Sequence, residues 1–153
     1  MIKEKISINL FRLNLTKLPK DLIDTSKIQK INLFKNCFRN IPSIIFECKD
    51  LSSLYLKSNF IQCVPRKIVF LKKLKRLELS NNKLITLPKE ISILTQLEVI
   101  DLWNNNLKTL PNNIIKLKNL KELYLDNNPN LKLTKIQKLW IKELKSNDCI
   151  VLL

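Results

Sequence analysis

A pattern of leucine, asparagine and proline recurs every 23 residues along this 153-residue chain and limits what it can fold into. The clearest copy spans residues 74–96 and reads LxxLxLxxNxLxxLPxxIxxLxx, where x is any residue. Copies in the same frame cover residues 5–27, 28–50, 51–73 and 97–119, and a partial copy covers 120–133. Such a period is typical of proteins built from stacked structural units.

Asparagine and proline keep this frame most strictly. One asparagine position is filled in five copies, by Asn36, Asn59, Asn82, Asn105 and Asn128. Five of the six prolines share another position, Pro19, Pro42, Pro65, Pro88 and Pro111. The first copy is the least regular, because Lys5 and Leu13 replace its expected leucine and asparagine. We interpret residues 1–153 as one domain of five full repeats, a partial sixth and a C-terminal segment.

Each repeat predicts a short strand followed by a helical turn. Leu77 and Leu79 alternate with polar residues, which is the period of a strand with one buried face. The Asn82 amide suits backbone groups that are left open where the chain leaves the sheet. Pro88 suits the start of a helical turn. The predicted fold is an α/β solenoid, a horseshoe with a parallel sheet on its concave face.

The segment 134–153 predicts a cap for the last repeat, which would otherwise expose its core. Thr134 and Gln137 have the spacing of a capping box, so we expect a helix from about Lys135 to Ser146. Apolar residues follow at helical spacing, namely Ile136, Leu139, Trp140 and Leu144. We expect Trp140 to cover the last repeat, and residues 149–153 to add a strand or to pack on the helix. The alternative is an amphipathic helix that binds a membrane or a partner.

The repeat unit resembles the intracellular, 23-residue class of leucine-rich repeats. That class includes the Ras-binding and Ras-suppressor scaffolds, the plant intracellular Ras-group proteins and the leucine-rich domains of some bacterial effectors. The resemblance covers about residues 5–133 and implies a non-catalytic protein-binding scaffold, commonly used in signal transduction. It makes a small GTPase, a kinase or a phosphatase component a candidate partner.

Composition argues against an enzyme and against a cofactor site. Histidine and glycine are absent, so neither a Ser-His pair nor a glycine-rich phosphate loop can form. The cysteines have no zinc-ligand spacing, and we expect no metal and no disulfide. Neither a signal peptide nor a 20-residue apolar span is recognisable, so we expect the protein to lie in the reducing cytoplasm. We also expect it to be a monomer.

The net charge of +15 allows a second hypothesis. Lysines at convex and edge positions would bind nucleic acid or another anionic surface. A simpler explanation is an AT-rich gene, because lysine, isoleucine and asparagine abound while alanine is absent and only four arginines occur. We favour the simpler explanation, and nucleic acid is the less favoured partner. A continuous lysine stripe would support nucleic-acid binding. An even scatter of lysines would instead support compositional drift toward AT-rich codons.

The outward positions of the strands supply the candidate binding residues. Aromatic side chains are expected there, at Phe11, Phe34, Tyr55, Trp103 and Tyr124, and aromatic residues are frequent interface anchors. Acids gather in the C-terminal half, and Glu78, Asp101 and Asp126 are the candidates to receive a partner's basic groups. Basic residues occupy the N-terminal half, at Arg12, Lys30, Lys35 and Lys57. In the alternative interpretation, the aromatics simply suit a sheet and the acids pair with Lys75, Arg76 and Lys121.

Overall fold

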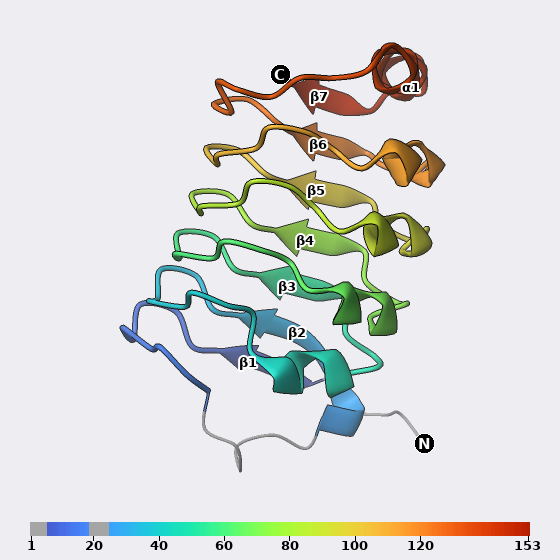
Figure 1. Cartoon of the computed structure of the whole chain (residues 1–153). Coiled ribbons are helices and arrows are strands. Elements are labelled where there is room, and N and C mark those ends of the chain that lie inside the picture. The colour runs from blue at the N-terminus through green and yellow to red at the C-terminus, as the bar shows by residue number, and fades with distance from the viewer. Residues whose placement is uncertain (1–5, 19–24) are drawn as a thin grey trace.

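The computed structural model describes residues 6–18 and 25–153, and these form one parallel sheet with helical turns on its opposite side (Figure 1). Seven strands follow one another in sequence order, each hydrogen-bonded to the next. Their bounds are β1 Ile6–Asn9, β2 Ile28–Asn32, β3 Ser53–Tyr55, β4 Arg76–Glu78, β5 Val99–Asp101, β6 Glu122–Tyr124 and β7 Ile150–Leu152. This architecture is the predicted leucine-rich solenoid.

The strand register confirms the 23-residue frame. Leu54 lies opposite Leu77, Leu77 opposite Ile100, and Ile100 opposite Leu123. Short 3-10 helices complete the repeats on the convex side, namely η1 Thr25–Lys27, η2 Ser43–Glu47, η3 Arg66–Phe70, η4 Lys89–Ile93 and η5 Asn112–Lys116. A proline directly precedes each of η2 to η5, as predicted. Lys5 and the segment 19–24, which includes Pro19 of the first repeat, lie outside the described residues.

The leucine positions of the repeats form one continuous core. Leu77, Ile100 and Leu102 are fully buried, and the core extends through the repeats from Ile28 to the C-terminal segment. Cys48 takes a leucine position and is also fully buried, and this burial raises the pKa of its thiol to about 11. Cys48 is therefore an uncharged packing residue.

A ladder of buried asparagines ties each repeat to the one before it. The Asn82 amide nitrogen donates to the carbonyl oxygens of Leu56 at 3.0 Å and Leu79 at 2.9 Å. Its Oδ1 accepts from the backbone N–H of Ile61 at 2.9 Å. The same three bonds recur around each of the other four, Asn36, Asn59, Asn105 and Asn128. The ladder therefore satisfies backbone groups that the sheet leaves open.

The position before each ladder asparagine adopts a left-handed conformation. Five residues there have φ between 51° and 55°, namely Lys35, Ser58, Asn81, Asn104 and Asn127. Arg12, which precedes Leu13 at the equivalent position of the first repeat, has a φ of 58°. Because the chain has no glycine, residues that carry a Cβ must adopt this left-handed conformation. Asparagine tolerates the conformation better than arginine, lysine or serine, so the C-terminal repeats satisfy it with less strain.

Replacing Asn82 with alanine should lower the free energy of unfolding by about 2–4 kcal/mol. The substitution leaves the buried N–H of Ile61 without its acceptor and removes two bonds to carbonyl oxygens. Asn106→Ala, at an exposed asparagine, is the matched control and should change stability by less than about 0.5 kcal/mol. Urea unfolding monitored by circular dichroism measures both. Equal midpoints for the two variants would contradict a structural role for the ladder.

The C-terminal segment forms the predicted cap. Helix α1 spans Lys135–Ser146, and Thr134 and Gln137 form the predicted capping box. Trp140 is 2% exposed, and its indole N–H donates to the carbonyl oxygen of Leu117 at 3.1 Å. Strand β7 then pairs with β6, which completes the sheet. In the described residues, α1 is the only α-helix, and no helix there has the length and apolar character of a membrane span.

One detail of the predicted helix is wrong. Ile136 and Leu139 are 61% and 66% exposed, so they do not belong to the buried face. The residues that face the last repeat are Gln137, Trp140, Ile141 and Leu144. Gln137 can be buried because its amide donates to the carbonyl oxygen of Leu110 at 3.0 Å.

Trp140→Ala should lower the free energy of unfolding by about 3–5 kcal/mol, because it leaves a cavity against the last repeat. Leu139→Ala removes an exposed apolar side chain from the same helix and should have an effect below about 0.5 kcal/mol. Thermal melts of the two variants make the comparison. A Trp140 variant as stable as the Leu139 variant would show that α1 is not a structural cap.

Candidate protein-binding face

The concave face is formed by the outward side chains of β1 to β6 and of the residues just after each strand. The strand register aligns one predicted column, Asn9, Asn32, Tyr55, Glu78, Asp101 and Tyr124. Neighbouring members of a column lie about 4.8 Å apart at the backbone. The predicted site residues therefore belong to one surface, although they come from positions up to 115 residues apart, from Phe11 to Asp126.

The aromatic residues of this face are partly accessible. Phe11 is 44% exposed, and Phe34, Tyr55, Trp103 and Tyr124 are intermediate. Three of the rings lie beneath a cation, and Arg12 Cζ is 5.9 Å from the centre of the Phe11 ring. Lys30 Nζ is 5.0 Å from the centre of the Tyr55 ring, and Lys57 Nζ is 5.9 Å from the centre of the Trp103 ring. These contacts hold lysines and rings together on the open surface.

Ser80 lies in the same column as Lys57 and Trp103, between them, and is fully buried. Its hydroxyl donates to Asp101 Oδ2 at 2.5 Å, and Asp101 Oδ1 accepts from the backbone N–H of Trp103 at 3.1 Å. Asp101 therefore fixes the backbone that carries Trp103. The strand period placed Ser80 outward but did not predict its burial, and its small size between two large side chains was the only available signal.

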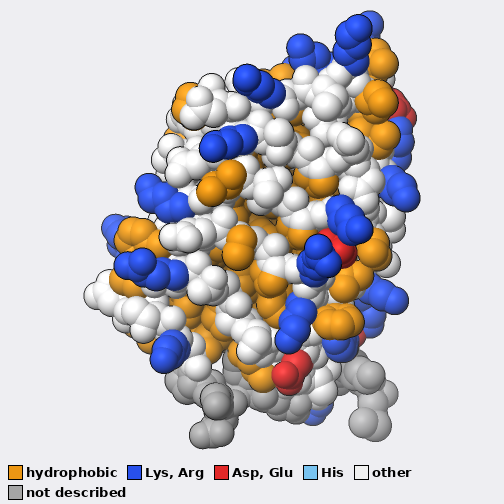
Figure 2. Space-filling view, in the orientation of Figure 1, with side chains coloured by type: hydrophobic (Ala, Val, Ile, Leu, Met, Phe, Trp, Pro, Cys, Tyr) orange, Lys and Arg blue, Asp and Glu red, His pale blue; other side chains and the backbone are white. Residues whose placement is uncertain are grey.

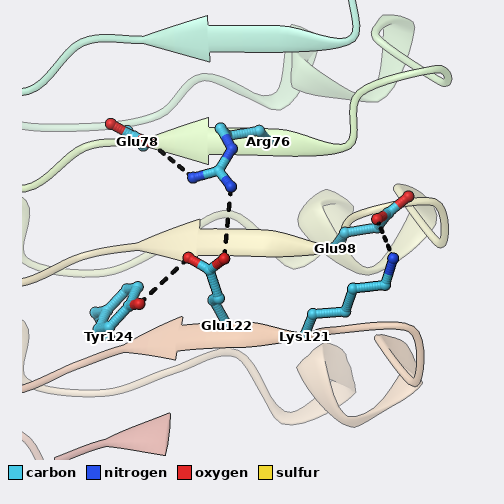
Figure 3. Close-up of polar contacts among 6 residues, drawn as sticks. All are labelled: Arg76, Glu78, Glu98, Lys121, Glu122 and Tyr124. Carbon is cyan, nitrogen blue, oxygen red and sulfur yellow. Dashed lines mark hydrogen bonds and ion pairs between the residues drawn. The ribbon is translucent and has the colours of Figure 1, made fainter. Parts of the chain in front are cut away.

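Arg76 connects two acids, one on its own strand β4 and one on β6 (Figure 3). Its guanidinium lies 2.9 Å from Glu78 on the same strand and 3.5 Å from Glu122 on β6. Glu122 also accepts from the Tyr124 hydroxyl at 3.2 Å. Burial first, and then the charge of Glu122, raise the pKa of Tyr124 above its ordinary value. Glu78 and Glu122 thus have partners within the chain, as the alternative interpretation expects.

Glu98 forms a second ionic group at the rim where the strands begin (Figure 3). Its carboxylate lies 2.6 Å from Lys121 Nζ and 3.0 Å from Lys75 Nζ. The hydrogen bond from Lys121, followed by that from Lys75, lowers the pKa of Glu98 from 4.5 to about 2. The three side chains link β4, β5 and β6 at one edge.

Asp126 differs from the other acids of the face. Its Oδ1 is buried and has no hydrogen-bond partner among the described residues. Asp126 also lines a cavity of about 600 Å³ at the C-terminal end, together with Asn104, Asn127 and Leu153. Of the predicted acids, Asp126 is therefore the one whose hydrogen-bonding capacity is least used within the described chain.

The convex and edge lysines do not form a continuous stripe on the face that Figure 2 shows. Blue side chains there are separated by white and orange surface (Figure 2). Several of these cations also have acidic partners: Lys73 pairs with Asp50, Lys118 with Glu143, and Arg66 with Glu90. This scatter favours compositional drift over a nucleic-acid surface.

The Glu98 carboxyl should titrate near pH 2 in the folded protein. Because its pKa is lowered on folding, its contribution to stability is fully present above pH 4.5 and disappears as the pH falls through about 2. Carbon-13 NMR of the side-chain carboxyl follows this titration. Lys121→Gln should raise the midpoint, whereas Lys72→Gln, at an exposed lysine that does not pair with Glu98, should not. A midpoint of 4.5 in the parent protein would disprove the ionic group.

Comparisons with known proteins agree on the repeat architecture. A family model described as a leucine-rich repeat region matches residues 61–152, and a leucine rich repeat model matches residues 26–84. No curated protein sequence matches the chain. These matches do not test the resemblance to the Ras-suppressor class.

Solved structures show the same architecture. A leucine-rich repeat protein of Leptospira interrogans is 36% identical, with a TM-score of 0.84, and the match covers 97% of this chain and 37% of that protein. The ectodomain of a plant membrane receptor kinase from Arabidopsis thaliana, in complex with Casparian strip integrity factor 2, is 28% identical. Its TM-score is 0.70, and the match covers 83% of this chain and 16% of the ectodomain chain. The chain therefore spans well under half the length of these two relatives, and it belongs to the leucine-rich repeat family.

Proposed function

We propose that this chain binds a protein partner on its concave face and acts as a non-catalytic scaffold. The leucine-rich repeat fold typically serves as such an interaction module, and the plant ectodomain was solved in complex with Casparian strip integrity factor 2. The observation that carries the proposal is a row of partly accessible aromatic side chains with charges beside them. Its main members are Tyr55, Trp103 and Tyr124.

Aromatic side chains of this kind suit a protein interface. They bury a large area while losing few rotamers, and hot spots are enriched in tryptophan and tyrosine. The strand backbone fixes the spacing of these rings before binding, which lowers the entropy lost on association. Asp101 adds to this by holding the backbone of Trp103. Phe11, Phe34, Glu78 and Asp126 complete the proposed surface.

Nucleic-acid binding through the convex lysines receives less support. The lysines are scattered on the face shown, and several have acidic partners. Nucleic-acid binding depends on many cations that neutralise successive phosphates along one track. We therefore keep a protein as the proposed partner.

The cellular setting is also a proposal. Cys63 is exposed, and all four cysteines, which fall within the described ranges, are free thiols. Free thiols are typical of a reducing compartment, which supports a place in the cytoplasm. We propose that the chain is a monomer there. Within it, a signalling role with a small GTPase, a kinase or a phosphatase component fits the resemblance seen in the repeats.

Trp103→Ala should weaken partner binding by about 2 kcal/mol or more, which is roughly 30-fold in Kd. Phe70→Ala is the matched control, because Phe70 is a 49% exposed aromatic residue on the convex side. It should change Kd by no more than about twofold. The experiment captures a partner from the source lysate with the parent protein, purifies it, and titrates it against each variant by calorimetry.

Circular dichroism must show that the Trp103 variant keeps the parent fold. A partner that binds Trp103→Ala as tightly as the parent would place the interface elsewhere. A partner that is lost with Phe70→Ala alone would move the interface to the convex side.

A further inference from the structure

The N-terminal half of the concave face carries cations and no acids. The strands β1 to β3 and the residues just after them, 6–12, 28–35 and 53–58, contain four cations: Arg12, Lys30, Lys35 and Lys57. None of the four forms an ion pair with a described residue. Three of them lie over aromatic rings instead, those of Phe11, Tyr55 and Trp103. Their charges are therefore not neutralised within the described chain.

The C-terminal half has the opposite charge. The corresponding residues of β4 to β6, 76–81, 99–104 and 122–127, contain four acids, Glu78, Asp101, Glu122 and Asp126. Arg76 is the only lysine or arginine in these segments, and it is held between Glu78 and Glu122. One cation cannot balance four acids, and Asp126 Oδ1 still has no hydrogen-bond partner among the described residues.

The two halves meet between β3 and β4 without cancelling each other. Tyr55 lies opposite Glu78 at this boundary. Among the described residues, no ion pair joins a cation of the first half to an acid of the second. The field along the concave face therefore runs from positive at β1 to negative at β6, and a surface of this kind orients a charged ligand.

From this arrangement we infer that the concave face selects an extended protein segment of opposite polarity. Acidic residues of the segment lie over β1 to β3, and basic residues lie over β4 to β6. This inference rests on the proposed concave-face function and specifies the partner. Six strands at about 4.8 Å span roughly 24 Å, which an extended chain covers with about seven or eight residues.

Each half offers matching chemistry to such a segment. Carboxylates of the segment meet Lys30 and Lys57, while its apolar groups contact Phe34 and Tyr55. At the other end, an arginine or lysine of the segment pairs with the partly exposed Asp126, which forms no ion pair with a described residue. Charge-assisted hydrogen bonds of this type are stronger than those between neutral groups.

A nucleic acid fits this face less well than a polarised peptide. The three strands of the cationic half span only about 10 Å, which is short for a polyanion. Beyond them, the phosphates would meet Glu78, Asp101 and Glu122, and like charges repel. Tighter binding of a nucleic acid is therefore the outcome that the test must distinguish.

The test compares two synthetic peptides of about eight residues and identical composition. In the block peptide, glutamates fill one half and lysines the other, whereas in the alternating peptide they follow in turn. Fluorescence anisotropy with labelled peptides should give at least about tenfold tighter binding of the block peptide in about 50 mM sodium chloride. Because both peptides have the same net charge, the net charge of the protein alone does not create this preference. The preference should shrink in high salt.

Two double variants link the preference to the concave face. Lys30→Glu with Lys57→Glu should abolish it, because the cationic half loses its central charges. Lys67→Glu with Lys116→Glu changes the net charge equally at exposed convex lysines and should leave the preference intact. Circular dichroism checks that both variants are folded.

Several results would overturn the inference. These are equal binding of the two peptides, no measurable binding of the block peptide, or a preference that survives Lys30→Glu with Lys57→Glu. Tighter binding of an oligothymidine than of the block peptide would favour nucleic acid instead. If a captured partner depends on Trp103 while the two peptides bind equally, the polarised ligand is wrong but concave-face binding stands.

Discussion

The asparagine ladder is the interaction on which the rest of the structure depends. In every repeat the chain leaves the sheet, bends and comes back through a helical turn. Where it leaves the sheet, its backbone groups lose their partners in the strand pairing. Asn82 and its equivalents satisfy those groups from within, and each links two successive repeats. Leucine burial supplies most of the driving force for folding, but it does not specify the register in which successive repeats stack. The ladder does, because its bonds form only when successive repeats keep one register.

That fixed register determines what the concave face can do. It places side chains from six strands on a common surface at regular spacing. The chemistry of the face then depends on which residues become neighbours across strands. Arg76 reaches Glu122 two strands away, and Lys57 reaches Trp103 over the small Ser80. Neither contact is local in sequence.

The charges of the molecule follow two different patterns. Lysines on the convex side are scattered on the face shown, and several have acidic partners, which fits a solvated surface shaped by composition. On the concave face, unpaired cations occupy one half, and acids outnumber the single arginine in the other. A face with opposite charges in its two halves orients a ligand, whereas net charge alone only attracts it.

The sequence alone determined the repeat frame, the strands, the helical turns after proline, and the cap with its capping box. Each depends on residues close together in the chain, where periodicity and local hydrogen bonding decide the conformation. It also predicted which side chains share the concave columns, because a constant period fixes the register. Only the tertiary structure decided that Ile136 and Leu139 face outward, that Ser80 is buried, and that Glu98 joins Lys75 and Lys121. These features depend on side-chain length and on neighbours 21 or more residues away, which no local pattern records.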